Sequence, residues 1–154
     1  MERKINILDK IGSLIPGYRG YAEKDGRRNC DKLLRDSIVV QLVEIENVLH
    51  LMMADSLKNK DKERMHNLEA LRKQIDTFRS KVNFAPYGKS ALFTDEQINE
   101  DELSNIYQYD YDLANEVSNL QTLIQGGEIS AIAFVFKQCN EILQKRNNYI
   151  NKFK

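Results

Sequence analysis

The sequence predicts an all-α protein, an antiparallel four-helix bundle with an additional short amphipathic helix at its N-terminus. Apolar residues recur every three or four positions in several separate stretches, which is the spacing of one helix face. Short segments rich in polar residues, glycine or proline separate these stretches. Short connections make successive helices antiparallel neighbours, and a length of 154 residues suits one domain. Residues 1–154 are therefore expected to form a single helical domain.

The N-terminal part is expected to contain a short helix over residues 4–15. Ile5, Leu8, Ile11 and Ile15 form its apolar stripe. Pro16 and the glycine after it should end this helix, because proline disfavours helical geometry in the residue before it. Residues 16–30 are expected to form a loop and the start of the next helix, and residues 31–153 the four-helix core.

The first two core helices should form a hairpin around a polar turn at residues 58–61. The helix before the turn is expected to begin between Ala22 and Asp31 and to end near Leu57, with one apolar side from Leu34 to Met52. The helix after the turn carries the same apolar spacing over residues 65–82. Both repeats are broad enough to face a bundle interior.

The third and fourth core helices follow a loop expected at residues 83–93. Thr94 and Gln97 fit a capping box, so the third helix is predicted to start there, with an interruption near Glu100. Its apolar side runs from Ile106 to Ile124, and two glycines at residues 126–127 should end it. The last helix is expected over residues 129–150.

Charge is distributed unevenly along the chain although the net charge is zero. Residues 91–128 contain nine acidic residues and no basic one, whereas residues 58–90 contain nine basic and four acidic residues. We expect the acidic third helix to lie beside a basic helix that neutralises it. The alternatives are an acidic docking face for a basic partner, or a divalent-cation patch, although the spacing is not that of a calcium loop. That patch would comprise Asp95, Glu96, Glu100, Asp101 and Glu102.

Composition argues against several classes of function. A net charge of zero is atypical of a dedicated nucleic-acid-binding domain, so no nucleic-acid partner is expected. No apolar run approaches the roughly 20 residues that span a bilayer, and the N-terminus lacks the pattern of a secretion signal, so we expect a cytoplasmic protein. Cys30 and Cys139 have no metal-ligand spacing and are expected to be small core side chains.

The bundle fold invites a search for a di-iron site, which needs Glu-x-x-His pairs on two helices. The two histidines are His50 and His66, and the last helix contains none. We therefore reject such a site and expect both histidines to be structural or on the surface. No metal, other cofactor or catalytic residue is predicted.

Asp110 occupies a position of the third helix where the apolar repeat requires an apolar residue. A buried carboxylate is costly unless it is paired. Either the apolar face shifts to Tyr109 at this point, or Asp110 meets a cationic or hydroxyl partner. We favour the shift to Tyr109.

The most specific segment is a Gly-Tyr-x-Gly-Tyr run with paired arginines and an Asp-x-x-Leu-Arg sequence after it. These motifs occupy residues 17–21, 27–28 and 31–35. Over about a quarter of the chain they resemble the N-terminal signature of a small family of uncharacterised helical bacterial proteins. The resemblance implies a helical bacterial protein and carries no mechanism, because that family has no established activity.

This segment is also our candidate for a binding surface, since tyrosine and arginine are favoured at recognition sites. The predicted partner-binding residues are Tyr18, Arg19, Tyr21, Arg27 and Arg28. In the competing interpretation, the tyrosines fill one end of the bundle and the arginines pair with nearby acids.

The sequence as a whole favours a non-enzymatic interaction or adaptor protein with a protein partner, and association with a second copy stays open. One alternative is weak binding to an anionic membrane surface through residues 1–15, whose apolar stripe lies beside Arg3, Lys4 and Lys10. The other is a metal-dependent activity that uses the acidic third helix.

Overall fold

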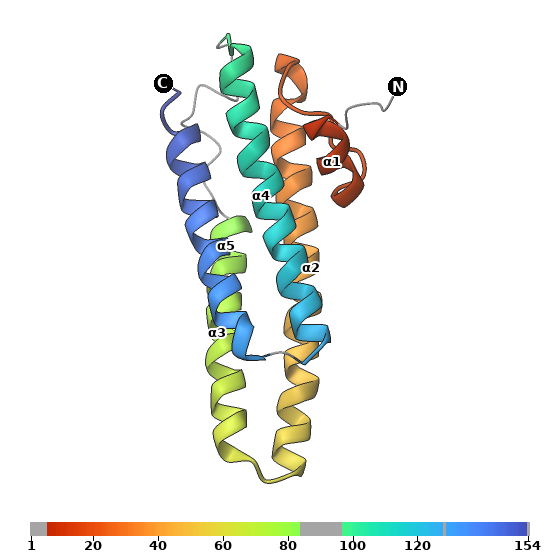
Figure 1. Ribbon diagram of the computed structural model, residues 1–154, viewed down its shortest axis with the longest axis vertical. Helices are drawn as coiled ribbons and strands as arrows, with labels where there is room; N and C mark the ends of the chain where they lie inside the picture. Colours follow the sequence, from red (N-terminus) through yellow and green to blue (C-terminus); the bar gives the residue numbers. More distant parts are fainter. Residues whose placement is uncertain (1–5, 84–96, 128, 154) are drawn as a thin grey trace.

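The computed structural model describes residues 6–83, 97–127 and 129–153, and within these ranges every regular element is a helix. The prediction of an all-helical bundle is confirmed (Figure 1). The elements are α1 (Ile7–Leu14), η1 (Lys24–Gly26), α2 (Arg27–Lys58), α3 (Lys62–Asn83), α4 (Glu100–Gln125) and α5 (Ile129–Ile150).

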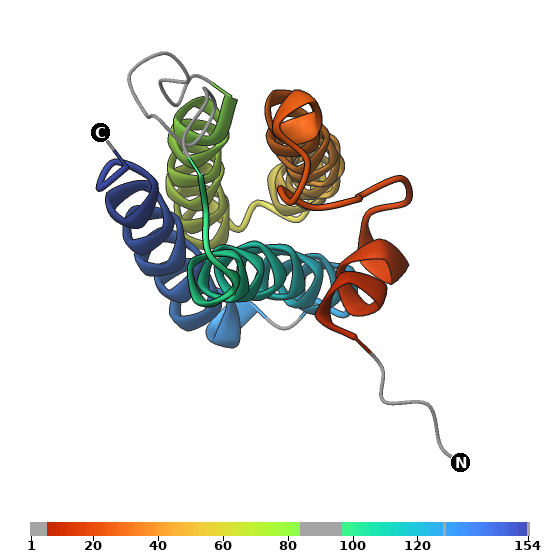
Figure 2. The same cartoon turned by 90° about the horizontal axis from the view of Figure 1, so that it is seen from above.

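The two helical hairpins are the main packing units. α2 packs along α3 after a tight turn at residues 59–61, and α4 packs along α5. The hairpins meet chiefly through α2 and α4 (Figure 1). Viewed from above, α1 lies outside the four long helices and packs on α4 (Figure 2). The start of α2, the start of α4 and the end of α5 therefore lie at the same end of the molecule.

Local sequence explains where the helices begin and end. Asn6 caps α1 by accepting a hydrogen bond from the Leu8 backbone N–H at 3.1 Å, so this helix begins later than predicted. α4 begins at Glu100 through a capping box between Asn99 and Glu102. The sequence contains two adjacent patterns of this kind. Thr94, which begins the predicted one, lies outside the described residues, and residues 97–99 are not helical.

The apolar repeat of α2 faces the interior as predicted. Leu34, Ile38, Leu42, Ile45 and Leu49 are almost completely buried, together with the corresponding residues of α3, α4 and α5. This arrangement removes one face of each helix from water, which is the dominant favourable contribution to folding. The four long helices thereby share one core.

The opposite side of α2 is unusually apolar. Val40, Val43, Leu51 and Leu57 are exposed, and Leu51 has 73% of its surface accessible. By length and composition α2 could cross a bilayer, although a third of its most apolar window is buried inside the bundle. The sequence contains no unbroken apolar run of that length, and α2 meets the limit only as an average over a window that includes polar residues. One such helix is weak evidence for a membrane span, because the core helix of a soluble protein can have the same length and composition.

Candidate functional site

The Gly-Tyr-Arg-Gly-Tyr segment, residues 17–21, forms a tight loop that we call the GYRGY loop. Its two glycines adopt left-handed backbone angles, with φ of 92° at Gly17 and 88° at Gly20, a region that glycine enters without a steric penalty. Between them the chain turns Tyr18 inward and leaves Arg19 exposed. Tyr21, after the second glycine, is completely buried. The loop thus anchors two phenols and presents one guanidinium group.

Both phenols donate hydrogen bonds to the same carboxylate. Oδ2 of Asp110 accepts from the Tyr18 hydroxyl at 2.5 Å and from the Tyr21 hydroxyl at 2.7 Å. Oδ1 accepts from Nε of Arg146 at 2.5 Å, and none of the surface of Asp110 is exposed. Our preferred expectation of a shift to Tyr109 was wrong, because that residue is only half-buried. The alternative, cationic and hydroxyl partners for Asp110, is confirmed.

Arg146 connects this carboxylate to a second one. Its Nη2 donates to Oδ1 of Asp31 at 2.6 Å and to the Tyr21 hydroxyl at 3.2 Å. Oδ2 of Asp31 accepts from Nε of Arg35 at 2.9 Å, and Nη1 of Arg35 donates to the backbone carbonyl of Val82 at 3.2 Å. We call this set the buried ion network, which comprises Tyr18, Tyr21, Asp31, Arg35, Asp110 and Arg146. It joins the GYRGY loop to all four long helices.

Additional contacts fix the backbone of the loop. The Tyr107 hydroxyl accepts a hydrogen bond from the Tyr21 backbone N–H at 3.0 Å, and the two rings stack with their centroids 6.0 Å apart. Nε of Arg27 donates to the Tyr21 carbonyl at 3.0 Å. A Cβ atom at Gly20 would lie 2.5 Å from the Tyr107 hydroxyl, so only glycine fits there. The loop is held through side chains and backbone together.

The electrostatics favour the protonation states that the network needs. Burial, and then the charge of Asp110, raise the pKa values of Tyr18 and Tyr21 well above the ordinary tyrosine range, so both remain donors. Burial opposes the charge of Arg146, but Asp110, Tyr21 and Asp31 outweigh it and keep the pKa above its usual value. The network therefore retains buried, paired ions.

Cys30 is buried next to the buried ion network, and Cys139 is buried elsewhere in the core. Burial raises the pKa of Cys30 to about 11 and that of Cys139 to about 12. Thiols with such values are weak nucleophiles at neutral pH, since the thiolate is the reactive form. Their burial agrees with the prediction of small core side chains.

The acidic residues of α4 differ in their contacts. Within the described ranges, Asp110 is the α4 residue that forms an ion pair, while Glu102 serves the helix cap and Asp112 accepts a hydrogen bond from Gln108. Neutralisation of the acidic helix by direct pairing is thus limited to Asp110 there. The same ranges contain no group of three His, Cys, Asp or Glu residues placed to hold a metal ion. Asp95 and Glu96, part of the predicted patch, lie outside them.

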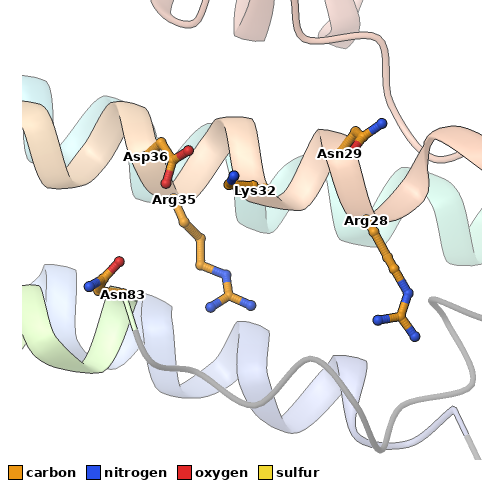
Figure 3. Close-up of a pocket in the computed structure, with 6 residues that line it drawn as sticks. All are labelled: Arg28, Asn29, Lys32, Arg35, Asp36 and Asn83. Atoms are coloured by element: carbon orange, nitrogen blue, oxygen red, sulfur yellow. The ribbon is translucent and has the colours of Figure 1, made fainter.

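A basic pocket of about 340 Å³ lies along the first half of α2 (Figure 3). The guanidinium groups of Arg28 and Arg35 extend from α2 to the same side. Arg35 is almost completely buried and belongs to the buried ion network, which therefore reaches the wall of the pocket. The lining residues are Arg28, Asn29, Lys32, Arg35, Asp36 and Asn83.

The structure separates the five predicted partner-binding residues into two groups. Tyr18, Tyr21 and Arg27 are buried, as the competing interpretation of a filled bundle end requires. Arg19 and Arg28 are on the surface, and their binding role stays a prediction.

Sequence reasoning missed Asp31, Arg35 and Arg146 as members of the site. Arg146 falls between Leu143 and Ile150 at the three-four spacing of the α5 core face. A charged residue in an apolar repeat is the same signal that singled out Asp110. Pairing the two by opposite charge would have revealed the centre of the network.

Comparison of the chain with known protein families, with curated proteins and with solved structures finds no match. The site is therefore interpreted from its own geometry.

Proposed function

We propose that this chain is a non-enzymatic interaction protein of the cytoplasm, an adaptor that presents Arg19 to an acidic group on a partner protein. Its scaffold would be an antiparallel four-helix bundle formed by α2 to α5. The observation that carries the proposal is the construction of the GYRGY loop. Two buried tyrosines hold the loop from inside, and the residue between its glycines faces solvent.

Arg19 is well suited to recognition because its base is rigid. The backbone next to it is fixed by Tyr18 and Tyr21, so little main-chain freedom is lost when a partner binds. Within the described part of the chain, Arg19 forms no hydrogen bond or salt bridge. Its planar fork matches a carboxylate or phosphate in two parallel hydrogen bonds.

The buried ion network supports a structural use of the polar residues over a catalytic one. Asp110 already accepts three hydrogen bonds, and its carboxylate is sealed from solvent. A general base or nucleophile must reach its substrate. These side chains instead hold the surface in shape.

The packing of α1 bears on the membrane alternative. Ile11 and Ile15 are buried, and the remaining apolar residues of α1 are partly buried in the same cluster. Membrane binding would need that apolar stripe to be exposed. We therefore propose a protein partner in preference to a lipid surface.

The test first recovers a protein partner by affinity purification with the wild-type chain and then measures its binding after charge changes at Arg19. We expect Arg19→Glu to weaken partner binding by about tenfold or more, and Arg19→Lys to retain part of the affinity because the charge stays but the fork is lost. Lys73→Glu, the same charge reversal at an exposed site on α3, is the matched control. Isothermal titration calorimetry measures affinity, and thermal melting checks the fold.

Equal partner binding by wild type and Arg19→Glu, with both proteins folded, would refute the proposal. The fold should survive the substitution, because Arg19 contributes no contact to the buried ion network.

A further inference from the structure

We propose that the basic pocket on α2 binds a phosphate group. The inference is independent of Arg19, because the pocket has its own lining and lies along α2 rather than in the GYRGY loop (Figure 3). It rests on the charges of the lining, on the placement of Arg35 and on the size of the hollow.

The lining is strongly cationic for a small pocket. Arg28, Lys32 and Arg35 contribute positive charge, and Asp36 is the acidic residue among those that line it. Charge-assisted hydrogen bonds from such groups to anionic oxygens are about twice as strong as neutral ones. The side-chain amides of Asn29 and Asn83 supply uncharged donors at the same site. This combination suits an anion with several oxygen atoms.

Contacts inside the protein fix the position of the Arg35 guanidinium group. Oδ2 of Asp31 holds its Nε and Nη2, each at 2.9 Å, and Arg146 in turn holds Asp31. A cation fixed in advance costs no reorganisation when an anion arrives, so a binding site gains from such support. Each guanidinium group has five N–H donors. Arg28 and Arg35 can therefore serve an added anion alongside the contacts they already make.

The surrounding helix adds to the positive potential. The first turn of α2 contains no acidic residue and begins with Arg27 and Arg28, although acidic residues are the favoured type at a helix N-terminus. The partial positive charge of the helix N-terminus adds to that of these cations, so the potential near this turn favours an anion.

Size and charge select phosphate among the anions. A volume of about 340 Å³ holds a phosphate together with part of the group that carries it. A phosphate monoester bears about −1.5 to −2 charges at neutral pH and offers three oxygen acceptors, more than one carboxylate can provide. The source can be the free anion or a phosphate ester, and both present the same chemistry to the lining.

The experiment is a titration with inorganic phosphate and with phosphoserine at constant ionic strength. Nuclear magnetic resonance should show shifts of the side-chain amide signals of Asn29 and Asn83 as the anion is added. We expect Lys32→Gln to weaken binding about tenfold, through loss of one charge-assisted contact. Asp36→Asn should tighten binding, because it removes the acidic group from the lining. Lys62→Gln, at the opposite end of the α2–α3 hairpin, is the matched control.

Stronger binding of phosphoserine would identify an esterified phosphate as the ligand, and stronger binding of inorganic phosphate would identify the free anion. Either result supports the pocket. The proposal is overturned if neither compound shifts those amide signals at up to about 20 mM. It is equally overturned if the Lys32 and Lys62 variants bind alike. The outcome is distinct from that of the Arg19 test, which needs no phosphate.

Discussion

Asp110→Asn is the sharpest test of the buried ion network. The substitution keeps the shape of the side chain but replaces one acceptor oxygen with a donor NH₂ group. Oδ2 serves Tyr18 and Tyr21, and Oδ1 serves Arg146, so the amide NH₂ group either faces the Arg146 donor or removes the acceptor that both hydroxyls now use. Arg146 also loses one of its two carboxylate partners while it stays buried.

The expected loss of unfolding free energy is about 3–5 kcal/mol, the typical cost of removing one partner from a buried ion pair. No discount for solvent screening applies, because none of the Asp110 surface is exposed. For a chain of this size, each kcal/mol lowers the melting temperature by about 2–4 °C. We therefore expect a decrease of about 6–20 °C, which calorimetry can measure, while urea titration measures the loss of unfolding free energy.

The control is Asp112→Asn, two positions further along α4. Its carboxylate accepts a hydrogen bond from Gln108 at the surface, so a change within about 0.5 kcal/mol is expected. A double-mutant cycle that combines Asp110→Asn with Arg146→Met should give a coupling of about 1–3 kcal/mol. If the free energy of unfolding of Asp110→Asn is within about 1 kcal/mol of the wild-type value, the buried ion network does not hold this end of the bundle together.

Further predictions concern the loop and the buried ionisable groups. Gly20→Ala should lower the free energy of unfolding by about 3 kcal/mol or more, and Gly17→Ala by only about 1–2 kcal/mol. Both positions require a left-handed backbone, but only a Cβ atom at Gly20 would clash with the Tyr107 ring. Comparable losses for the two variants in urea titration would contradict this. The pKa of the Cys30 thiol is near 11, against an ordinary value of 9.0. At pH 8 this thiol should therefore react with a disulfide reagent about a hundredfold more slowly in the folded protein than in urea. Equal rates would show that the folded thiol is accessible. Because the pKa of Tyr21 is raised in the folded protein, its hydroxyl loses its proton at lower pH in the unfolded chain, so stability is retained below about pH 10 and falls above it. Tyr21→Phe should reduce this fall of the unfolding free energy with pH in urea titrations. An unchanged pH dependence would rule out a contribution from Tyr21.

The helices could be predicted from the sequence because their signals are local. Leu34, Ile38 and Leu42 repeat at the spacing of one helix face, and burial follows from that spacing alone. The glycines after α4 gave the end of that helix for the same reason, and Gly127 indeed has a φ of 73°. The start of α4 was harder, because two adjacent segments satisfied one capping pattern.

The sequence located Asp110, the centre of the buried ion network, but could not identify all the residues that contact it. Asp110 was identified as an irregularity in an apolar repeat, and its two possible explanations were both recognised. Choosing between them required knowing that Arg146 lies opposite, which depends on the packing of α4 against α5. The tyrosines were noticed as well, but side-chain direction in an irregular loop depends on two glycine conformations that the sequence permits without specifying.

The hydrogen bond between Tyr21 and Arg146 joins residues 125 positions apart. Residues up to Arg146 must therefore be synthesised before the GYRGY loop can make this contact, and closing so large a separation is entropically demanding. Translation that stopped anywhere before α5 would leave Asp31 and Asp110 without their shared cation. A chain that lacks α5 should therefore fold less stably at this end of the bundle, because burying two carboxylates without a cation is costly.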